Sequence, residues 1–479
     1  MKTFLLAPLV IALAACAHMD PNGSTSRPLD VATLGAQDTP AMQWPDQQWW
    51  QRYNDPQLNA LIADAVTGSP SLVTAQARLA RASANASSAN AALYPQANAT
   101  ATATRQRYTE NGIVPPPLGG TIRTDARLAL NLSYDFDFWN RNGSALKAAL
   151  SESRAAEAET HAARNVLMSS VAASYFNLQR LFAQHAVLED AIKQRGGVFD
   201  LTQQRFRNGI DTRVEVKQAE SLLAQARADN AQVDEAIALQ RNQLAALLGA
   251  GPDRVAGLQP VTLAAPSYAA PANVPLSLVG HRAEIVAARW RVEAAQRNVD
   301  VAKAAFYPDI NISAFAGVSS LGFPKLLEGG SGIFGIGPAI TLPIFEGGRL
   351  NANLQGRQAD IDLAIASYNQ AVIDAVHEVS DTLDSIRALG RQADEQRQAR
   401  QATQEAYDLA LQRYKAGLGN YLTVLTAQST VLAQERLDTD LQARAFTLDV
   451  ALARALGGGV TLPDSLTALP PATVAATRR

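Results

Sequence analysis

The chain has 479 residues, of which 47% are hydrophobic, 6% aromatic and 18% charged. Because alanine carries much of the apolar content, large cores are not expected. The 42 lysines and arginines nearly balance the 44 aspartates and glutamates, so a nucleic-acid partner is disfavoured. The single cysteine excludes an internal disulfide framework, and the five histidines form no closely spaced pair. No cofactor and no metal site are therefore expected.

Residues 1–15 have the pattern of a secretory signal, with Lys2 ahead of an apolar stretch that is too short to span a bilayer as a mature helix. The ending Leu13-Ala14-Ala15-Cys16 resembles the bacterial lipobox, which implies cleavage before Cys16 and lipidation of that cysteine. Alternatively, Cys16 is an ordinary residue of the signal. Alanine rather than aspartate follows it, and resemblance to sorted lipoproteins then favours the outer membrane of a Gram-negative cell.

The remaining sequence offers no apolar run of about 18 residues, which a membrane helix needs. Any crossing of a membrane would therefore depend on strands. Residues 16–54 are expected to form a lipid-anchored linker ahead of the first repeat.

An internal duplication organises the rest of the chain. Residues 205–249 align without a gap with residues 413–457, and the aligned pairs include Phe206 with Tyr414 and Gly209 with Gly417. A repeat of this length is not a solenoid period, and it indicates two copies of one module of helix, β-hairpin and helices. The predicted segments are a first repeat (55–250), a linker (251–280), a second repeat (281–457) and a C-terminal tail (458–479).

Four segments alternate between apolar and polar residues, as strands with one oily and one wet face do. They are residues 96–104, 126–138, 310–318 and 334–344. Their order predicts two β-hairpins, at 94–139 and 307–345, and each strand is near the length that crosses hydrocarbon. A soluble sheet edge would show the same pattern. In lipid, however, four strands could not close around a pore, so several chains would have to contribute strands.

The helical segments fall into two lengths. Residues 142–207 and 348–415 contain no proline, and each segment predicts a helix on the order of 100 Å long. Two shorter helices stacked end to end would match one long helix. His185 lies on a coiled-coil seam of the first long segment, where we interpret it as a packing residue rather than a ligand. The shorter helices are expected at 56–93, 213–249, 281–306 and 421–456.

Several motifs carry a family resemblance over nearly the whole mature chain. They are the opening Trp49-Trp50-Gln51-Arg52-Tyr53-Asn54-Asp55-Pro56, the Tyr-Pro pair before each hairpin, and Leu342-Pro343-Ile344-Phe345-Glu346-Gly347-Gly348-Arg349. In this order and spacing they resemble the outer-membrane efflux proteins of TolC type, and the lipidated start resembles the NodT-like lipoprotein branch.

This resemblance implies a mainly α fold with β: a trimeric transmembrane β-barrel with four strands per protomer, continued by a long α-helical coiled-coil tunnel in the periplasm. Such a homotrimer sits in the outer-membrane lipid. It is a passive exit duct that a periplasmic membrane-fusion adaptor and an inner-membrane pump serve as partners.

Two turns, near 205–213 and 413–421, are the candidate sites of partner contact. Each carries a glycine where a helix reverses, and glycine readily takes the positive φ that such an end favours. By resemblance these turns form the adaptor-facing periplasmic tips. The matching residues are Arg205, Phe206, Gly209, Arg413, Tyr414 and Gly417. The alternative is that they only cap and pack the helices.

The closed entrance would lie just after the second turn, where members of the family often carry aspartates. This sequence has Leu422, Thr423 and Thr426 there, so an acidic ring is in doubt. Asp211 or Glu215 near the first turn could supply negative charge instead. Opening is expected to be a shift of helical twist at the tips, driven by adaptor contacts.

Three rival functions remain open at this point. An enzyme is disfavoured because no nucleophile elbow, phosphate loop or zinc-protease motif is present. A coiled-coil lipoprotein scaffold without a channel would explain the helices but not the four alternating strands. A type I protein-secretion duct would share the architecture, although the lipobox and the opening motif favour small molecules.

Overall fold

The structure is a computed structural model that describes residues 26–29, 46–262, 264, 266 and 280–467. The chain forms two compact units, each assembled from separate stretches of sequence. Of the described residues, unit 1 contains 26–28, 78–156 and 288–368, and unit 2 contains those within 46–77, 157–287 and 369–467 together with residue 29. Cys16, the predicted lipidation site, lies outside the described residues.

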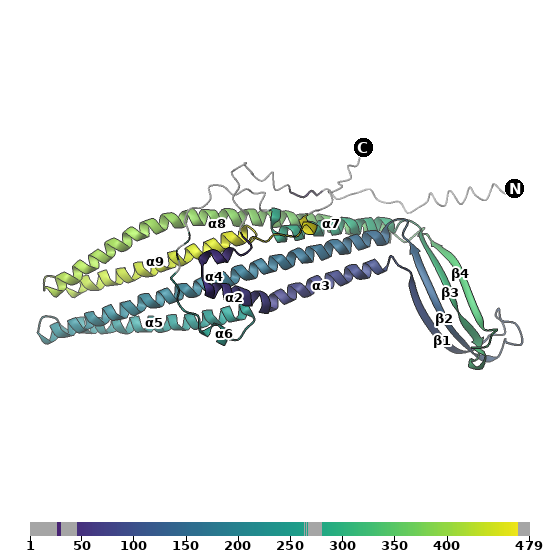
Figure 1. The fold of residues 1–479 in the computed structure, drawn as a ribbon, viewed down its shortest axis with the longest axis horizontal. Helices are drawn as coiled ribbons and strands as arrows, with labels where there is room; N and C mark the ends of the chain where they lie inside the picture. Colours follow the sequence, from purple (N-terminus) through teal and green to yellow (C-terminus); the bar gives the residue numbers. More distant parts are fainter. Residues whose placement is uncertain (1–25, 30–45, 263, 265, 267–279, 468–479) are drawn as a thin grey trace. The chain divides into compact units, whose positions relative to one another are not determined.

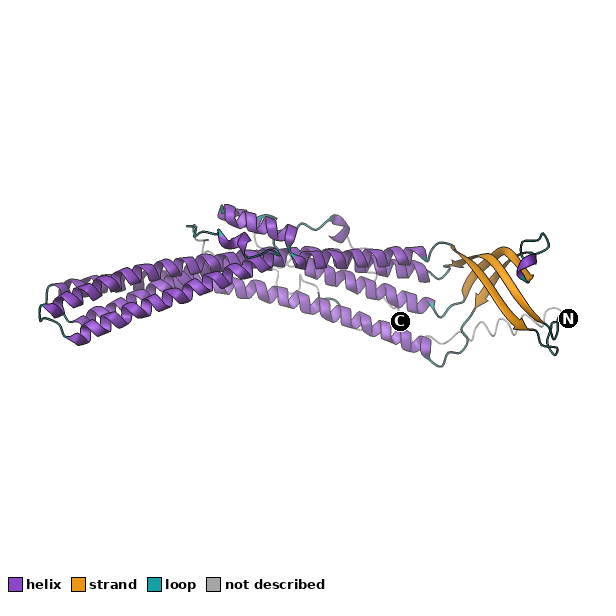
Figure 2. Ribbon diagram, turned by 90° about the horizontal axis from the view of Figure 1, so that it is seen from below, coloured by secondary structure: helices purple, strands orange, loops and turns teal. Residues whose placement is uncertain are grey.

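Unit 1 carries one antiparallel four-stranded sheet in the order β1-β2-β3-β4 (Figure 2). Both hairpins predicted from the alternating segments are present, and they pair with each other through β2 and β3. Within the described chain, β1 and β4 each pair along one side only. The strand bounds are β1 Gln96–Arg107, β2 Ile122–Phe136, β3 Asp309–Leu321 and β4 Gly332–Thr341.

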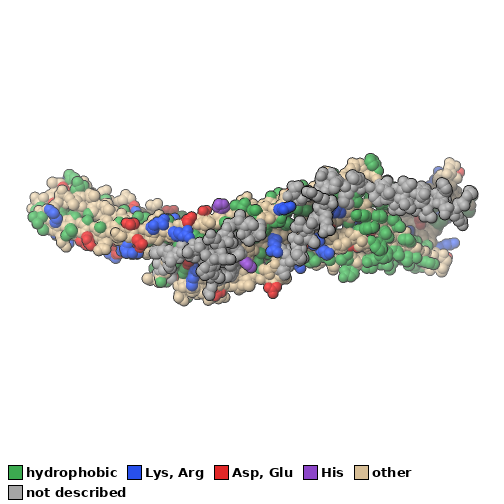
Figure 3. All heavy atoms as spheres, turned by 90° about the horizontal axis from the view of Figure 1, so that it is seen from above, with side chains coloured by type: hydrophobic (Ala, Val, Ile, Leu, Met, Phe, Trp, Pro, Cys, Tyr) green, Lys and Arg blue, Asp and Glu red, His purple; other side chains and the backbone are tan. Residues whose placement is uncertain are grey.

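One face of this sheet is apolar and exposed. On the outer strand β4, Phe334 and Ile336 expose 89% and 76% of their surface, and on β2 Leu130 exposes 58%. Figure 3 shows hydrophobic side chains gathered over the strands. An oily face of this extent needs a lipid or protein environment, because a soluble protein rarely leaves such a patch to water.

The helices of the two units differ greatly in length (Figure 1). The two long ones, α4 and α8, have 67 residues each, as the uninterrupted segments predict. The bounds are α2 Pro56–Gly68, α3 Pro70–Ala91, α4 Arg141–Arg207, α5 Arg213–Leu248, α6 Asp253–Ala256, α7 Ala283–Ala304, α8 Arg349–Lys415, α9 Tyr421–Ala455 and α10 Asp464–Thr467; two short 3-10 helices are η2 Trp49–Tyr53 and η4 Phe323–Lys325.

The single helix predicted for residues 56–93 is wrong, because the structure divides it into α2 and α3. Ser69 between them is extended, with ψ at 124°. Pro70 explains the break, since its ring disfavours the helical conformation of the preceding residue and it has no amide hydrogen to donate. The proline was visible in the sequence, and its position marks the boundary.

End-to-end stacking of the shorter helices is found in unit 2. The end of α5 at Gly249 lies so close to Gly68 and Pro70 that an added Cβ would come within 2.4 Å of the Gly68 carbonyl oxygen. At the other repeat, Arg282 just before α7 donates to the carbonyl oxygen of Ala455, the last residue of α9. A guanidinium at this position satisfies a carbonyl that the end of a helix leaves free.

The opening motif contributes to a hydrophobic core of unit 2. Trp49 and Trp50 are buried, and Tyr53 packs edge-on against Phe176 at 4.8 Å between ring centroids. Asp55 caps α2 by accepting from two backbone amides, and it also accepts from the buried Tyr175 hydroxyl. The motif is therefore explained by packing and helix capping.

Candidate functional site

The two turns of unit 2 have the same backbone hydrogen bonds. In the first turn (208–212), Gly209 donates to the Phe206 carbonyl and Ile210 to the Arg205 carbonyl. In the second turn (416–420), the aligned donors make the corresponding bonds, from Gly417 to Tyr414 and from Leu418 to Arg413. This arrangement satisfies carbonyl groups at a helix end.

Gly209 and Gly417 have φ values of +70° and +77°. Nothing lies within 4 Å of a Cβ added to either residue. The reason for glycine is therefore the left-handed conformation itself rather than a lack of space. The prediction of positive φ at both turns is confirmed.

Each turn is followed by a capped helix, but the caps differ. Thr212 accepts from the Val214 amide and forms a capping box with Glu215, whose carboxylate accepts from the Thr212 amide at 2.8 Å. In the second turn, Asn420 accepts from the Thr423 amide at 2.9 Å. Thr423 aligns with Glu215, so the second turn has no carboxylate to complete a box.

A polar link joins the first turn to the end of α8. Asp211 accepts from the Arg205 Nε at 3.0 Å and from the Tyr414 hydroxyl. Arg205 also donates to the Tyr414 carbonyl oxygen at 3.1 Å, and its guanidinium lies 4.4 Å from the centre of the Tyr414 ring. We call these three residues the Arg205–Asp211–Tyr414 link.

The link is nearly closed to water. The side chains of Arg205 and Asp211 are 12% and 9% exposed, and Tyr414 is 1% exposed. Burial and the hydrogen bond to Asp211 raise the pKa of Tyr414 to about 12. The same carboxylate raises the pKa of Arg205. At neutral pH the link therefore holds a charged guanidinium and a protonated phenol.

A small hydrophobic cluster lies behind the link. Tyr421 and Val424 of α9 are buried there with Val198 of α4 and Ala219 of α5. The Tyr414 and Tyr421 rings lie 6.1 Å apart between centroids. Residues from both helical hairpins thus share one core next to the turns, and separating the hairpins would expose it.

The predicted adaptor-facing residues divide into two groups. Arg205 and Tyr414 are turned inward and form the link, so in this conformation they offer little or no surface to a partner. Phe206 is 43% exposed and Arg413 is also exposed. The outward group was incomplete in the sequence interpretation, because other apolar side chains beside the turns are exposed as well: Ile210 at 60%, Val214 at 61%, Leu418 at 73% and Leu422 at 62%.

The residues expected at the entrance lie on the first turns of α9. Leu422, Thr423 and Thr426 are all exposed, and the Thr426 hydroxyl donates to the Leu422 carbonyl oxygen. Of the two acids considered as alternative sources of charge, Asp211 is already paired with Arg205, and Glu215 belongs to the capping box. The ion pair with Arg205 compensates the charge of Asp211, whereas the hydrogen bonds of the capping box leave the Glu215 carboxylate negatively charged at the start of α5.

Further polar contacts join the two hairpins away from the turns. Arg180 of α4 pairs with Asp440 of α9 at 3.1 Å, and Asp229 of α5 pairs with Arg436 of α9 at 2.8 Å. Within the first hairpin, His185 of α4 contacts Asp234 of α5 at 3.2 Å. Sequence reasoning missed the two pairs between the hairpins, because residues more than 200 positions apart carry no local signal of their contact.

No group of histidine, cysteine or acidic side chains suited to a metal is found among the described residues. Likewise, no helix in the described ranges is long and apolar enough to cross a membrane.

The comparisons with known proteins all point to the same family. The family model described as outer membrane efflux protein matches residues 61–250 and 275–458. The multidrug resistance outer membrane protein MdtQ of Escherichia coli O6:H1 is 32% identical over 468 residues, which cover 94% of this chain and 97% of MdtQ. MdtP of Escherichia coli K12, also named a multidrug resistance outer membrane protein, is 33% identical over 428 residues, or 87% of each chain.

A solved structure supports the same assignment. The outer membrane protein VceC from Vibrio cholerae superposes with a TM-score of 0.81 at 41% identity, and the match covers 87% of this chain and 100% of VceC.

Proposed function

Because this chain belongs to the outer membrane efflux protein family, whose channels are trimers that work with adaptor and pump partners, we propose that three copies enclose one passage for small drug-like molecules. The chain is an outer-membrane efflux channel component, a transport duct and not an enzyme. Its fold supplies strands to a barrel and helices to a tunnel that extends into the periplasm.

The observation that carries the proposal is the sheet with one exposed apolar face and two strands that pair on one side only. Unpaired amide and carbonyl groups are too costly to leave in lipid, so the free sides of β1 and β4 must find partners. In a symmetric ring, β1 of one copy pairs with β4 of the next. Three copies would then close a barrel of about twelve strands, an even number as expected for such barrels.

We propose that the two turns are the periplasmic tips, where an adaptor docks. The exposed apolar side chains beside the turns supply its contact surface, with Phe206, Leu418 and Leu422 as the most prominent members. The Arg205–Asp211–Tyr414 link keeps the two hairpins together in the closed state. Adaptor binding favours a state in which the link is broken and Leu422, Thr423 and Thr426 move away from the axis of the passage.

The cargo is assigned from the relatives. MdtQ and MdtP are named for multidrug resistance, and by that likeness drug-like small molecules are favoured over secreted protein. The energised pump would select among them, because a passive duct supplies no energy of its own.

Membrane attachment is proposed to include a lipid on Cys16, on the strength of the lipobox-like sequence. Incorporation of labelled palmitate into the wild-type chain, and none into Cys16→Ser, is the expected result. Equal labelling of both chains would contradict it.

The two aligned repeats are proposed to be copies of one ancestral module, which agrees with their equivalent turns.

Native mass spectrometry combined with planar-bilayer recording tests the assembly. The purified chain is expected to have the mass of a trimer and to conduct ions, at low conductance while the link is closed. A monomer without conductance, in the wild type and in variants of the link alike, would overturn the proposal and favour a scaffold.

A further inference from the structure

The cross-strand register sorts the side chains of the sheet onto two faces. Residues directly opposite each other share a face, and one such row runs from Ala101 through Leu128 to Val318. Two residues further along β2, the row of Ala99, Leu130 and Ala316 is again apolar and shares this face. In the other direction, the row next to Leu128 contains Thr102, Arg127 and Ser319, which lie on the opposite, polar face.

The polar face consists mostly of small side chains. Beside Arg127 on β2 comes Ala129, and opposite Ala129 on β3 is Gly317. No side chain could replace Gly317, since an added Cβ would lie 2.2 Å from the Leu128 carbonyl oxygen. Because Ala129 and Gly317 are small, the Arg127 side chain can extend over the sheet surface beside them.

Phe315, Leu321 and Ile333 are the larger apolar residues on this face, and Phe315 is the aromatic one among them. It lies opposite Asn131 on β2 and Gly335 on β4, and it is 37% exposed. Its ring leans over Gly335, where an added Cβ would come within 2.8 Å of two ring carbons. Only glycine at position 335 therefore leaves room for the Phe315 ring in this position.

Arg127 reaches this ring across the shallow part of the face. The centre of its guanidinium lies 5.1 Å from the centre of the Phe315 ring, within the range of a cation–π interaction. Arg127 is exposed, and among the described residues no ion pair is found for it. A guanidinium that stacks through its flat side keeps its N–H donors at the edge free for a carboxylate, sulfonate or phosphate.

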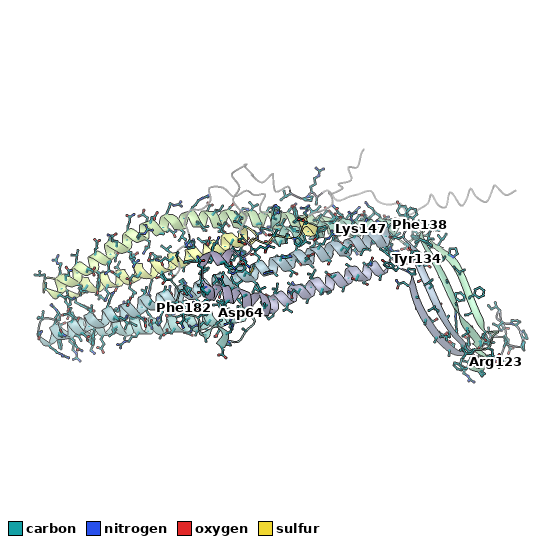
Figure 4. All side chains as sticks on the ribbon, in the orientation of Figure 1. Asp64, Arg123, Tyr134, Phe138, Lys147 and Phe182 are labelled. Atoms are coloured by element: carbon teal, nitrogen blue, oxygen red, sulfur yellow. The ribbon has the colours of Figure 1, made fainter. Side chains whose placement is uncertain are left out.

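The charges on this face are unevenly distributed. Arg123 and Arg127 lie with Asp125 towards the loops that end the hairpins, and Figure 4 marks Arg123 at that end of β2. Asp135 and Asp309 lie at the other end, next to the helices. The half of the polar face that carries Arg127 is therefore positive.

We propose that Arg127, held in place by Phe315, is a transit site for anionic groups on the wall of the passage. In a symmetric assembly its copies form a positive collar inside the barrel, which raises the local concentration of anionic solutes and lowers that of cationic ones. The proposal rests on the polar face of the sheet lining the water-filled passage, and it is independent of the turns.

The local potential can be measured with a cysteine reporter. Thr102 is exposed and directly opposite Arg127, so Thr102→Cys places a thiol beside the guanidinium. The probes are an anionic and a cationic methanethiosulfonate reagent, a sulfonatoethyl and a trimethylammonioethyl derivative, applied to the assembled full-length trimer in about 0.1 M salt. The chain without the added thiol, which retains only Cys16, provides the blank.

The expected result is a lower ratio of anionic to cationic reaction rate in Thr102→Cys/Arg127→Gln. If the local electrostatic potential falls by kT per elementary charge, the anionic reagent reacts about e-fold more slowly and the cationic reagent about e-fold faster. The ratio of the two rates then changes by about sevenfold. Arg127→Lys keeps the charge and is expected to keep most of the ratio. Phe315→Leu removes the stacking and is expected to lower the ratio partly.

A distant reporter separates a local effect from a global one. Ser313 is exposed on the same face of β3, and its partner Ser133 lies six residues from Arg127, about 20 Å along the strand. This distance exceeds the Debye length of about 10 Å at 0.1 M salt. The ratio at Ser313→Cys is therefore expected to stay unchanged by Arg127→Gln.

Each other outcome contradicts a definite part of the account. An unchanged ratio at position 102 in Arg127→Gln, or an equal change at both reporters, overturns the transit site. An unchanged ratio in Phe315→Leu removes the positioning role of Phe315. A reporter that reacts with neither reagent shows that the polar face is closed to water, which contradicts the proposed passage instead. If Arg127→Gln does not assemble, Arg127→Met serves as the uncharged variant, and an unchanged ratio at position 102 in that chain overturns the transit site.

Discussion

The first and second turns have equivalent backbone hydrogen bonds, but the aligned side chains differ in exposure and in their partners. Phe206 of the first turn is 43% exposed, whereas the aligned Tyr414 of the second is 1% exposed. Arg205 is paired with Asp211, but the aligned Arg413 is exposed, and the residue aligned with Asp211 is Gly419. The two aligned turns thus share their backbone hydrogen bonds, while one turn carries the acid of the link and the other the phenol.

This difference has a functional consequence. Two turns with identical side chains would form no specific contact, because each would present an exposed phenylalanine and an exposed arginine. With Asp211 in one turn and Tyr414 in the other, the two hairpins recognise each other through a buried hydrogen bond. Differentiation of the repeats therefore supplies the contact that keeps the hairpins together.

The largest expected effect comes from comparing Arg205→Ala with Arg413→Ala. Removing Arg205 leaves the Asp211 carboxylate buried without its charge partner, which costs on the order of 3 kcal/mol. Arg413 is exposed, and its loss is expected to have almost no effect. Hydrogen exchange of the turn amides should accelerate about 100-fold in Arg205→Ala only. Equal exchange in the two variants would refute the asymmetry.

A smaller effect is expected for Tyr414→Phe. The change removes one hydrogen bond to a charged acceptor, worth about 1.5–3 kcal/mol, and it leaves the ring in place. Phe206→Tyr is the matched control at the aligned position, because Phe206 is 43% exposed and has no part in the link. Hydrogen exchange at the turns should accelerate in the first variant and stay unchanged in the second. An equal response at both positions would show that the phenol has no special partner.

The third prediction concerns what the turns share. Gly209→Ala and Gly417→Ala each force a Cβ into a left-handed conformation, which costs about 1–2 kcal/mol. Because no atom lies within 4 Å of the added Cβ in either turn, the two costs should be nearly equal. Thermal unfolding of the purified trimers measures both. A much larger loss at one glycine would reveal a packing constraint that the shared backbone does not contain.

The smallest effect is expected at the capping box. The Thr212 hydroxyl and backbone amides lower the pKa of Glu215 below its ordinary value of 4.5. Its contribution to the stability of α5 is therefore present above about pH 4.5 and is lost as the pH falls through the lower pKa of the folded chain. Glu215→Gln should abolish this acid-dependent fraying, measured by hydrogen exchange of the Val214 amide. The second turn, with Thr423 at the aligned position, should show no such pH dependence.

Local signals predicted much of this architecture. Alternation predicted four strands in two hairpins, and the aligned glycines predicted two turns with positive φ. These features depend on residues close together in the sequence, where periodicity and backbone preference act directly. Two local predictions were inaccurate: the strand predicted at 126–138 runs from Ile122 to Phe136, and the helix predicted at 56–93 is divided at Pro70.

Two features could not be predicted for physical reasons. The contact of Asp211 with Tyr414 joins residues 203 positions apart, and neither residue has a local preference that indicates the other. Phe315 interrupts the polar row of an otherwise regular strand, and only the register with Gly335 shows where its ring fits. Long-range packing, rather than local propensity, determines both.

Single-channel conductance tests the central claim most directly. The account predicts that trimers with Arg205→Ala and Tyr414→Phe together open to a higher conductance than wild-type trimers, whereas trimers with Arg413→Ala and Phe206→Tyr keep the wild-type conductance. Equal conductance in all three, with intact trimers confirmed by native mass, would contradict the claim that the Arg205–Asp211–Tyr414 link holds the passage closed.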